Sequence, residues 1–124
     1  MSRLLGGFQR TCTLFSNNDA LAADILAAGT AKDDPLWRLP LWQGYRSQLD
    51  SKIADLNNAP GGGMAGAITA ALYLEQFVSK DTVWAHVDLF AWNQSTRPGR
   101  PEGGEAMTLR AMFEVIAKRF GSKQ

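Results

Sequence analysis

The one histidine of this chain lies two residues before an aspartate, within a segment whose composition predicts a β-strand. His86 and Asp88 would point to the same face of that strand, because side chains alternate along it. Imidazole and carboxylate groups both bind zinc, but a zinc site needs three or four ligands, and no third ligand stands close by in the sequence. We therefore interpret the pair as buried polar residues that bond to the backbone or to another subunit, and we predict no metal site.

A run of three glycines, Gly61 to Gly63, precedes a predicted helix. The free amides of a helix N-terminus can hold a phosphate or a carboxylate. A phosphate loop continues with Gly-Lys-Ser or Gly-Lys-Thr, whereas Met64 and Ala65 follow here. The run therefore favours a tight turn over a nucleotide site.

Two arginines in the string RPGRPEGGE, Arg97 and Arg100, have the charge to bind an anion, and Glu102 and Glu105 follow them closely. Because these carboxylates compete for the guanidinium groups, a solvated or salt-bridged loop is the preferred interpretation. Glu105 also stands where an acidic side chain would stabilise the first turn of the last helix. An anion site is the alternative.

Composition and charge exclude several classes of protein. The 124 residues carry 13 basic and 12 acidic side chains without a charged run, so neither nucleic acid nor a membrane surface is an expected partner. The single cysteine, Cys12, allows no internal disulfide, which fits a reducing compartment, and it belongs to no local motif of a catalytic thiol. No apolar run is long enough to span a membrane, and the N-terminus lacks a signal-peptide core. One cytoplasmic domain is expected.

Helices and strand-like segments alternate along the chain. The string SNND (16–19) has the pattern of a helix start, with Ser16 or an Asn as the cap. That helix is expected to end at Gly29, a C′ glycine. Residues 32–40 contain two prolines and are expected to be irregular.

A second helix is predicted further on, because apolar side chains recur at helical spacing: Trp42, Tyr45, Leu49 and Ile53. Residues 54–57 are a possible strand. The segment 58–63 has three glycines after a proline and predicts a loop.

The second half of the chain has the clearest patterns. Segment 64–78 is apolar on nearly all sides and predicts a helix buried in the core. Segment 82–90, TVWAHVDLF, is rich in β-branched and aromatic residues and predicts a strand at the centre of a sheet. After a loop at 93–104, segment 105–120 predicts an amphipathic helix, whose apolar side carries Leu109, Met112, Phe113, Ile116 and Phe120. Helices separated by strands predict an α/β fold.

Five blocks of sequence resemble, in order and spacing, the end of the catalytic domain of the leucyl (cytosol) aminopeptidase family. They are WRLPLW (37–42), ADLNN (54–58), AGAITAALYLEQF (65–77), WAHVDL (84–89) and RPGRPEGGEA (97–106). The resemblance covers residues 14–124, and residues 1–13 look divergent. It implies the C-terminal part of an α/β catalytic domain, with a partial mixed sheet and helices packed on it.

Enzymes of this family remove the N-terminal residue from peptides. Two divalent metals, zinc or manganese, polarise the scissile carbonyl and activate a water. The family's key motif is NTDAEGR, and the nearest string here, SNND (16–19), lacks the continuation. The metal-binding lysine segment of the family has no counterpart either. The resemblance therefore implies no catalytic residue, no metal ligand and no cofactor bound by this chain alone.

The resemblance does carry over three substrate-binding positions. Ala59 matches a position that faces the residue after the scissile bond. Phe90 and Asn93 match positions that line the pocket for the N-terminal side chain. The family often has small residues after the WAHVDL strand, whereas FAWN (90–93) stands here, so the preference of the pocket for leucine is left open.

The family is hexameric, which implies a homo-oligomer, and subunit contacts are expected near Trp84, Phe90 or Trp92. The leading hypothesis is the C-terminal portion of a leucyl aminopeptidase-type enzyme that contributes scaffold and pocket wall, and activity of this chain alone is not expected. The alternatives are a non-catalytic module that binds peptides or subunits, and a small-anion binder. The incomplete phosphate motif favours the scaffold.

Overall fold

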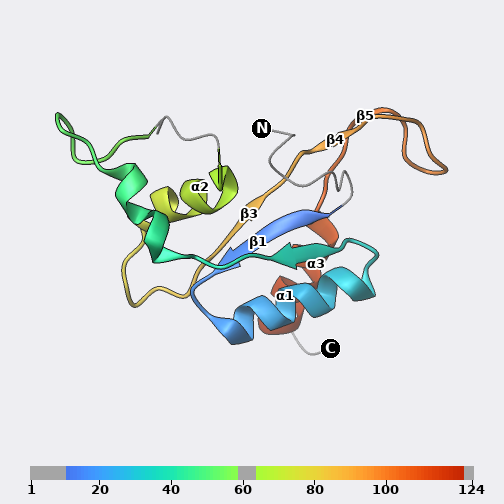
Figure 1. Ribbon diagram of the computed structural model, residues 1–124. Helices are drawn as coiled ribbons and strands as arrows, with labels where there is room; N and C mark the ends of the chain where they lie inside the picture. Colours follow the sequence, from blue (N-terminus) through green and yellow to red (C-terminus); the bar gives the residue numbers. More distant parts are fainter. Residues whose placement is uncertain (1–10, 59–63, 122–124) are drawn as a thin grey trace.

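The computed structural model describes residues 11–58 and 64–121. Its centre is a mixed three-stranded sheet in the order β2–β1–β3 (Figure 1). Strand β1 (Cys12–Ser16) pairs in parallel with β2 (Leu36–Arg38) and antiparallel with β3 (Ala85–Asp88). Helices α1 (Asp19–Ala31) and α3 (Leu109–Phe120) cover one face of the sheet, and α2 (Gly66–Glu75) lies against the other. The predicted α/β fold with a partial mixed sheet is confirmed.

Strand β1 connects the two halves of the core. All five of its residues are buried. Because side chains alternate along a strand, Leu14 enters one core cluster with Ile25 of α1 and Val115 of α3, while Phe15 enters the other with Ala67 of α2. No element was predicted before the helix start at Ser16, and residues 32–40, which contain β2, were expected to be irregular. The expectation for residues 32–40 is wrong, and strands of five and three residues carry too little periodicity to be recognised.

Strand β3 confirms the strand predicted within 82–90 but not its place in the sheet. In the described part of the chain it lies at an edge, and its four residues are only half-buried. The central position belongs to β1 instead. A run of β-branched and aromatic residues indicates that a segment forms a strand, but the neighbours of that strand depend on the rest of the fold.

Helix α1 begins where the string SNND predicts. The side chain of Asn18 is the cap, and it accepts a hydrogen bond from the backbone N–H of Leu21 at 2.8 Å. The helix does not end at Gly29 as predicted but continues to Ala31. A Cβ on Gly29 would lie 2.7 Å from the carbonyl oxygen of Asp34. Glycine is therefore needed there for close packing, and not to end the helix.

The second predicted helix is a short 3-10 helix, η1 (Gln43–Leu49), which packs against α2. Leu49 is buried, as predicted for the inner face. Ile53, the last residue of the predicted face, is 98% exposed and lies outside any helix. Residues 54–57 form no strand. The prediction of a longer helix is wrong. Apolar residues at helical spacing do not ensure that the chain stays helical after Leu49, the last residue of η1 and the one that is buried.

Helix α2 confirms a helix within 64–78, but only one side of it is buried. The buried residues are Ala67, Thr69, Ala71 and Leu72. Leu74 and, just beyond the helix, Phe77 are exposed. The helix was predicted to lie in the core with neighbours on several sides, and this prediction is therefore wrong for the described part of the chain. The helix has contacts with η1 and β1, and these elements cover only part of its apolar surface.

Truncation of Leu72 to alanine is expected to lower the free energy of unfolding by about 2–5 kcal/mol, because its removal from a buried site leaves a cavity. The side chain of Leu72 is fully buried. Leu74→Ala is the matched control in the same helix, and it should cost much less because Leu74 is exposed. Denaturant unfolding of both variants measures the difference. Equal losses would show that Leu72 is not the principal core contact of α2.

Helix α3 begins at Leu109, later than the predicted residue 105. It packs along α1 through the buried residues Ala111 and Val115, with Met112 partly buried beside them. The other large apolar residues of the predicted inner face are 58–80% exposed: Leu109, Phe113, Ile116 and Phe120. None of the described helices is both long and apolar enough to cross a membrane.

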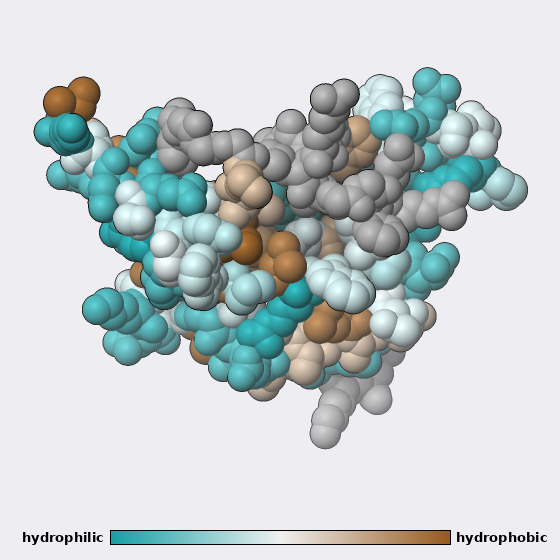
Figure 2. Space-filling view, viewed as in Figure 1, coloured by the Kyte–Doolittle hydropathy of each residue, from teal (hydrophilic) through white to brown (hydrophobic). Residues whose placement is uncertain are grey.

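A short hairpin extends beyond the sheet. Its strands, β4 (Trp92–Asn93) and β5 (Gly103–Gly104), pair antiparallel, and all of their residues except Trp92 lie in the segment 93–104 that was expected to be a loop. The hairpin points away from α1 and α3 (Figure 1). Polar side chains dominate this arm, whereas apolar atoms remain exposed near the middle of the same view (Figure 2). The hairpin therefore depends on polar contacts more than on a core, and these contacts form the candidate site.

Candidate functional site

His86 lies on β3 opposite Phe15 of β1, and the two rings stack with centroids 5.9 Å apart. Burial lowers the pKa of His86 below its ordinary value, and the negative charge of Asp88 opposes that shift. In the described residues, no three His, Cys, Asp or Glu side chains lie close enough to hold a metal. The geometry thus supports a packing role for a neutral His86, while the predicted lack of a metal site stays a prediction.

Cys12 is buried at the start of β1. Burial is the largest cause that raises the pKa of its thiol to about 11, and the negative charges of Asp34, Asp88 and Glu105 add to the shift. The thiolate is the nucleophilic form of cysteine. A thiol with this pKa is almost fully protonated near neutral pH, which agrees with the expectation that Cys12 is not a nucleophile.

The predicted substrate-binding residues fall in two parts of the chain. Phe90 lies two residues after the end of β3 and is half-buried, and Asn93 belongs to β4. Between them Ala91 has a φ of 55°, in the left-handed region that costs a non-glycine residue about 1–2 kcal/mol. This residue turns the chain from the sheet into the hairpin. Ala59 and the glycine run 61–63 lie outside the described residues.

The side chain of Asn93 closes the hairpin. It is 5% exposed. Its amide nitrogen Nδ2 donates to the carbonyl oxygens of Arg100 and Pro101 at 3.0 and 2.8 Å, and its oxygen Oδ1 accepts from Nε of Arg97 at 3.3 Å. Every polar atom of the carboxamide is therefore bonded within the hairpin. A direct contact between Asn93 and a substrate stays a prediction.

Glu105 joins both arginines of the hairpin. Its carboxylate accepts from Nη2 of Arg97 at 3.1 Å and forms an ion pair with Arg100. Its backbone N–H also donates to the carbonyl oxygen of Ala91 at 3.0 Å. Glu102, the other predicted partner, is exposed. The contacts agree with the salt-bridged interpretation of Arg97 and Arg100, since one carboxylate already holds both guanidinium groups.

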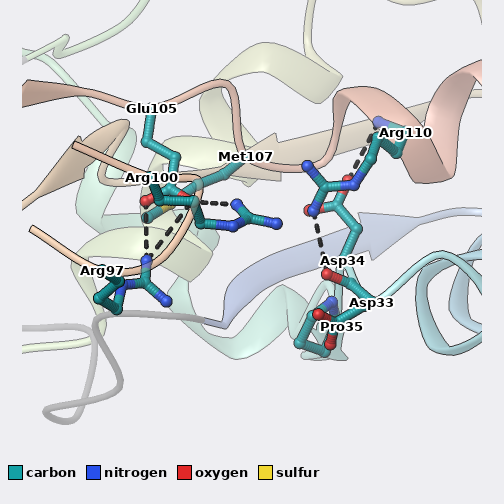
Figure 3. Close-up of a pocket in the computed structure, with 8 residues that line it drawn as sticks. All are labelled: Asp33, Asp34, Pro35, Arg97, Arg100, Glu105, Met107 and Arg110. Atoms are coloured by element: carbon teal, nitrogen blue, oxygen red, sulfur yellow. Dashed lines mark hydrogen bonds and ion pairs between the residues drawn. The ribbon is translucent and has the colours of Figure 1, made fainter.

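A cavity of about 120 Å³ lies between this cluster and the start of α3 (Figure 3). It is lined by Asp33, Asp34, Pro35, Arg97, Arg100, Glu105, Met107 and Arg110. Figure 3 shows two separate groups of contacts around it, one centred on Glu105 and one on Asp34. Because arginines and carboxylates are equally numerous in this lining, the cavity has no excess charge that would select an anion.

Asp34 is the residue of this region that sequence reasoning missed. Its buried carboxylate accepts hydrogen bonds from the backbone N–H groups of Thr108, Arg110 and Ala111 at 2.9, 3.1 and 3.2 Å. These are the donors that a helix leaves free in its first turn. The cap residue Thr108 has a φ of 66°, and its own side chain makes no cap bond. Asp34 therefore caps α3 from another part of the chain.

One local signal does accompany Asp34. An Asp followed by a Pro, as at 34–35, favours a turn. That signal indicates a bend after α1, and it contains no information about a helix whose capped residue is 74 positions away.

A family model that describes the cytosol aminopeptidase family, catalytic domain, matches residues 4–113 of this chain. This chain belongs to the cytosol aminopeptidase family. The match confirms the resemblance inferred from the five sequence blocks.

Two curated relatives in the cytosol aminopeptidase family illustrate the extent of the match. The probable cytosol aminopeptidase of Desulforapulum autotrophicum is 48% identical over 106 residues, which make up 83% of this chain and 20% of the relative. That of Caulobacter vibrioides is 44% identical over 110 residues, or 86% of this chain and 22% of the relative. The chain thus spans about a fifth of the length of these relatives.

Solved structures of similar proteins also match nearly all of this chain but only part of their own length. The cytosol aminopeptidase from Coxiella burnetii has a TM-score of 0.90 and 49% identity, over 97% of this chain and 26% of that chain. The bottromycin maturation enzyme BotP in complex with Mn has a TM-score of 0.86 and 32% identity, over 94% of this chain and 26% of that chain. The sheet and helices described above are therefore part of a cytosol aminopeptidase catalytic domain.

Proposed function

We propose that this chain is the C-terminal portion of a leucyl aminopeptidase-type metallo-exopeptidase, which removes N-terminal residues from peptides. Its own contribution is scaffold and pocket wall. The observation that carries the proposal is the similarity to the Coxiella burnetii cytosol aminopeptidase over 97% of this chain. A cytoplasmic location and assembly into a homo-oligomer are part of the proposal, with no nucleic acid or membrane as partner.

The two divalent metals of such enzymes do not fit the described residues. Within 11–58 and 64–121, no three potential ligands converge, and His86 stacks on Phe15. The solved BotP neighbour is a complex with Mn, which supports a metal in the whole enzyme. We assign the metal ligands to the remainder of a longer protein, and no step of the reaction is derived on this chain.

For the substrate, we propose that Ala59, Phe90 and Asn93 form part of the pocket wall. Phe90 is half-buried and lies two residues after the end of β3. After Phe90, the left-handed turn at Ala91 and the hydrogen bonds of the Asn93 side chain fix the course of the backbone. An aromatic ring fixed in this way limits the size of the side chain that the pocket accepts.

A chimera tests this proposal. The matching segment of the Coxiella burnetii cytosol aminopeptidase is replaced by this chain, and cleavage of leucyl-p-nitroanilide is measured with Mn²⁺. The chimera should retain activity within about a hundredfold of the parent, since a misplacement of about 1 Å costs on that order. The parent enzyme without the segment is the negative control. A folded chimera without activity would contradict the proposal.

The same chimera tests the pocket wall. Phe90→Ala should change the ratio of kcat/KM between leucyl and alanyl substrates by about tenfold or more, the effect of one or two methylene groups in an apolar pocket. Phe77→Ala replaces a phenylalanine that is exposed just beyond α2, and it should leave the ratio unchanged. An unchanged ratio in the Phe90 variant would remove Phe90 from the wall.

A further inference from the structure

Ala91 is a strained residue at the edge of the proposed pocket wall. Its φ of 55° lies in the left-handed region, which a residue with a Cβ rarely adopts. Such a conformation persists only where the surrounding contacts determine it. Ala91 directly follows Phe90, so the contacts that hold Ala91 also fix the direction in which the backbone leaves Phe90.

Glu105 holds Ala91 from the opposite side of the hairpin. Its backbone N–H donates to the carbonyl oxygen of Ala91 at 3.0 Å, next to the pair of Trp92 with Gly104 that joins β4 to β5. A two-stranded ladder without a core of its own is only marginally stable in water. The position of Ala91 therefore depends on what else keeps Glu105 in place.

The side chain of Glu105 supplies that second attachment (Figure 3). Its carboxylate accepts from Nη2 of Arg97 at 3.1 Å and also pairs with Arg100. These arginines are the two ends of the hairpin turn, which backbone hydrogen bonds of 2.8 and 2.9 Å close between them. The side chain of Glu105 is 11% exposed, so its charge-assisted bonds are screened less than those of an open surface pair.

Asn93 completes the network between the turn and the start of the hairpin. Nε of Arg97 donates to the side-chain oxygen of Asn93, whose amide nitrogen donates to two carbonyl oxygens at the end of the turn. Glu105 thus reaches the residue after Phe90 through its backbone, and it reaches Asn93 through Arg97. All of these contacts lie within this chain, and they need no other part of a longer enzyme.

We propose that Glu105 is a positioning residue for the pocket wall. By holding Ala91 and the hairpin turn together, it fixes where the ring of Phe90 lies, and it thereby helps to determine which N-terminal side chain of a peptide is accepted. The inference deepens the proposed function and rests on it, because it needs Phe90 to line the pocket. Glu105 acts only through the backbone beside Phe90, and no contact between Glu105 and the substrate is part of the inference.

Amide hydrogen exchange of the full chain tests the positioning. Glu105→Gln keeps the size of the side chain but removes its charge. The protection of the amides at 97, 100 and 105, which bond within the hairpin, should fall by about tenfold or more, because a hydrogen bond to a charged group contributes at least that factor. Glu102→Gln is the matched control, since it makes the same substitution at an exposed glutamate of the same segment. It should leave the protection unchanged.

The chimera with the Coxiella burnetii enzyme tests the link to the substrate. Glu105→Gln should change the ratio of kcat/KM between leucyl and alanyl substrates by about threefold or more, a part of the effect of one methylene group in an apolar pocket. In the Phe90→Ala background the same substitution should change the ratio no further, because its effect passes through the ring. A loss of folded enzyme lowers the cleavage of both substrates by one factor and leaves the ratio unchanged, so a purely stabilising role of Glu105 would not give this result.

The outcomes separate this inference from the proposed function. If Phe90→Ala changes the ratio and Glu105→Gln does not, the pocket wall stands and the positioning role is wrong. That role is also refuted by unchanged amide protection in Glu105→Gln, by an equal fall in Glu102→Gln, or by an effect on the ratio that is as large without Phe90 as with it. A folded but inactive chimera refutes the proposed function, and an unchanged ratio in Phe90→Ala refutes the pocket wall. In both cases the role of Glu105 in specificity fails with them, even if the amide protection responds as expected.

Discussion

Purified alone, this chain is expected to cleave neither leucine amide nor leucyl-p-nitroanilide, whether Mn²⁺ or Zn²⁺ is present. Two-metal hydrolysis needs a water activated between bound metals. The sequence contains no NTDAEGR string, and no three potential ligands converge in the described residues. The rate should therefore equal that of buffer, while the chimera with the Coxiella burnetii enzyme is the positive control. Metal-dependent turnover by pure, peptidase-free protein would refute this expectation.

Metal binding gives a second test of the same expectation. With two neighbouring candidate ligands at most, calorimetry should find no stoichiometric Zn²⁺ site tighter than about micromolar. His86 is the residue to replace if a tight site appears. Loss of that site in His86→Ala would show that His86 and Asp88 bind metal, and their interpretation as structural residues would then be wrong.

Asp34→Ala is expected to lower the free energy of unfolding by about 3–5 kcal/mol. The carboxylate accepts from three backbone N–H groups at the start of α3. A hydrogen bond to a charged group contributes about 1.5–3 kcal/mol, and a buried donor left without a partner adds a desolvation cost. The donors of Thr108 and Ala111 are buried with Asp34, so water cannot fully replace the carboxylate.

The neighbouring aspartate is the matched control. Asp33 is exposed and has a φ of 50°, a conformation that asparagine tolerates. Asp33→Asn should therefore be close to neutral. Asp34→Asn keeps one oxygen acceptor and should lie between the control and Asp34→Ala. Denaturant unfolding, with exchange of the α3 amides as a local readout, measures all three variants. Equal stability of Asp33→Asn and Asp34→Ala would show that the cap does not support α3.

Signals close together in the sequence predicted local structure well. The cap at Asn18 and the helix after it depend on four adjacent residues. The strand within 82–90 and the helices within 64–78 and 105–120 follow from composition and periodicity. Their ends were less accurate. The start of α3, for example, is set by hydrogen bonds that the carboxylate of Asp34 accepts from backbone N–H groups and not by the acidic residue at 105.

The candidate site was predictable in part for the same reason. Arg97, Arg100 and Glu105 stand within nine positions of one another, so their salt bridges could be inferred from the string itself. Asn93 was placed by family resemblance as a pocket residue, and its burial could not be inferred. That burial depends on how the hairpin folds back, which brings the carbonyl oxygens of Arg100 and Pro101 to its side chain.

By itself, the sequence determined the family, the α/β class and the local chemistry of the hairpin. Only the tertiary structure decided the central place of β1, the cap that Asp34 provides and the exposed face of α3. These features depend on residues far apart in the chain. Asp34 and Thr108, for example, are 74 positions apart. Helix α3 has apolar residues on both faces, so periodicity alone could not choose between them. Its small residues face α1, where they allow the two helices to approach closely, and the large ones remain outside.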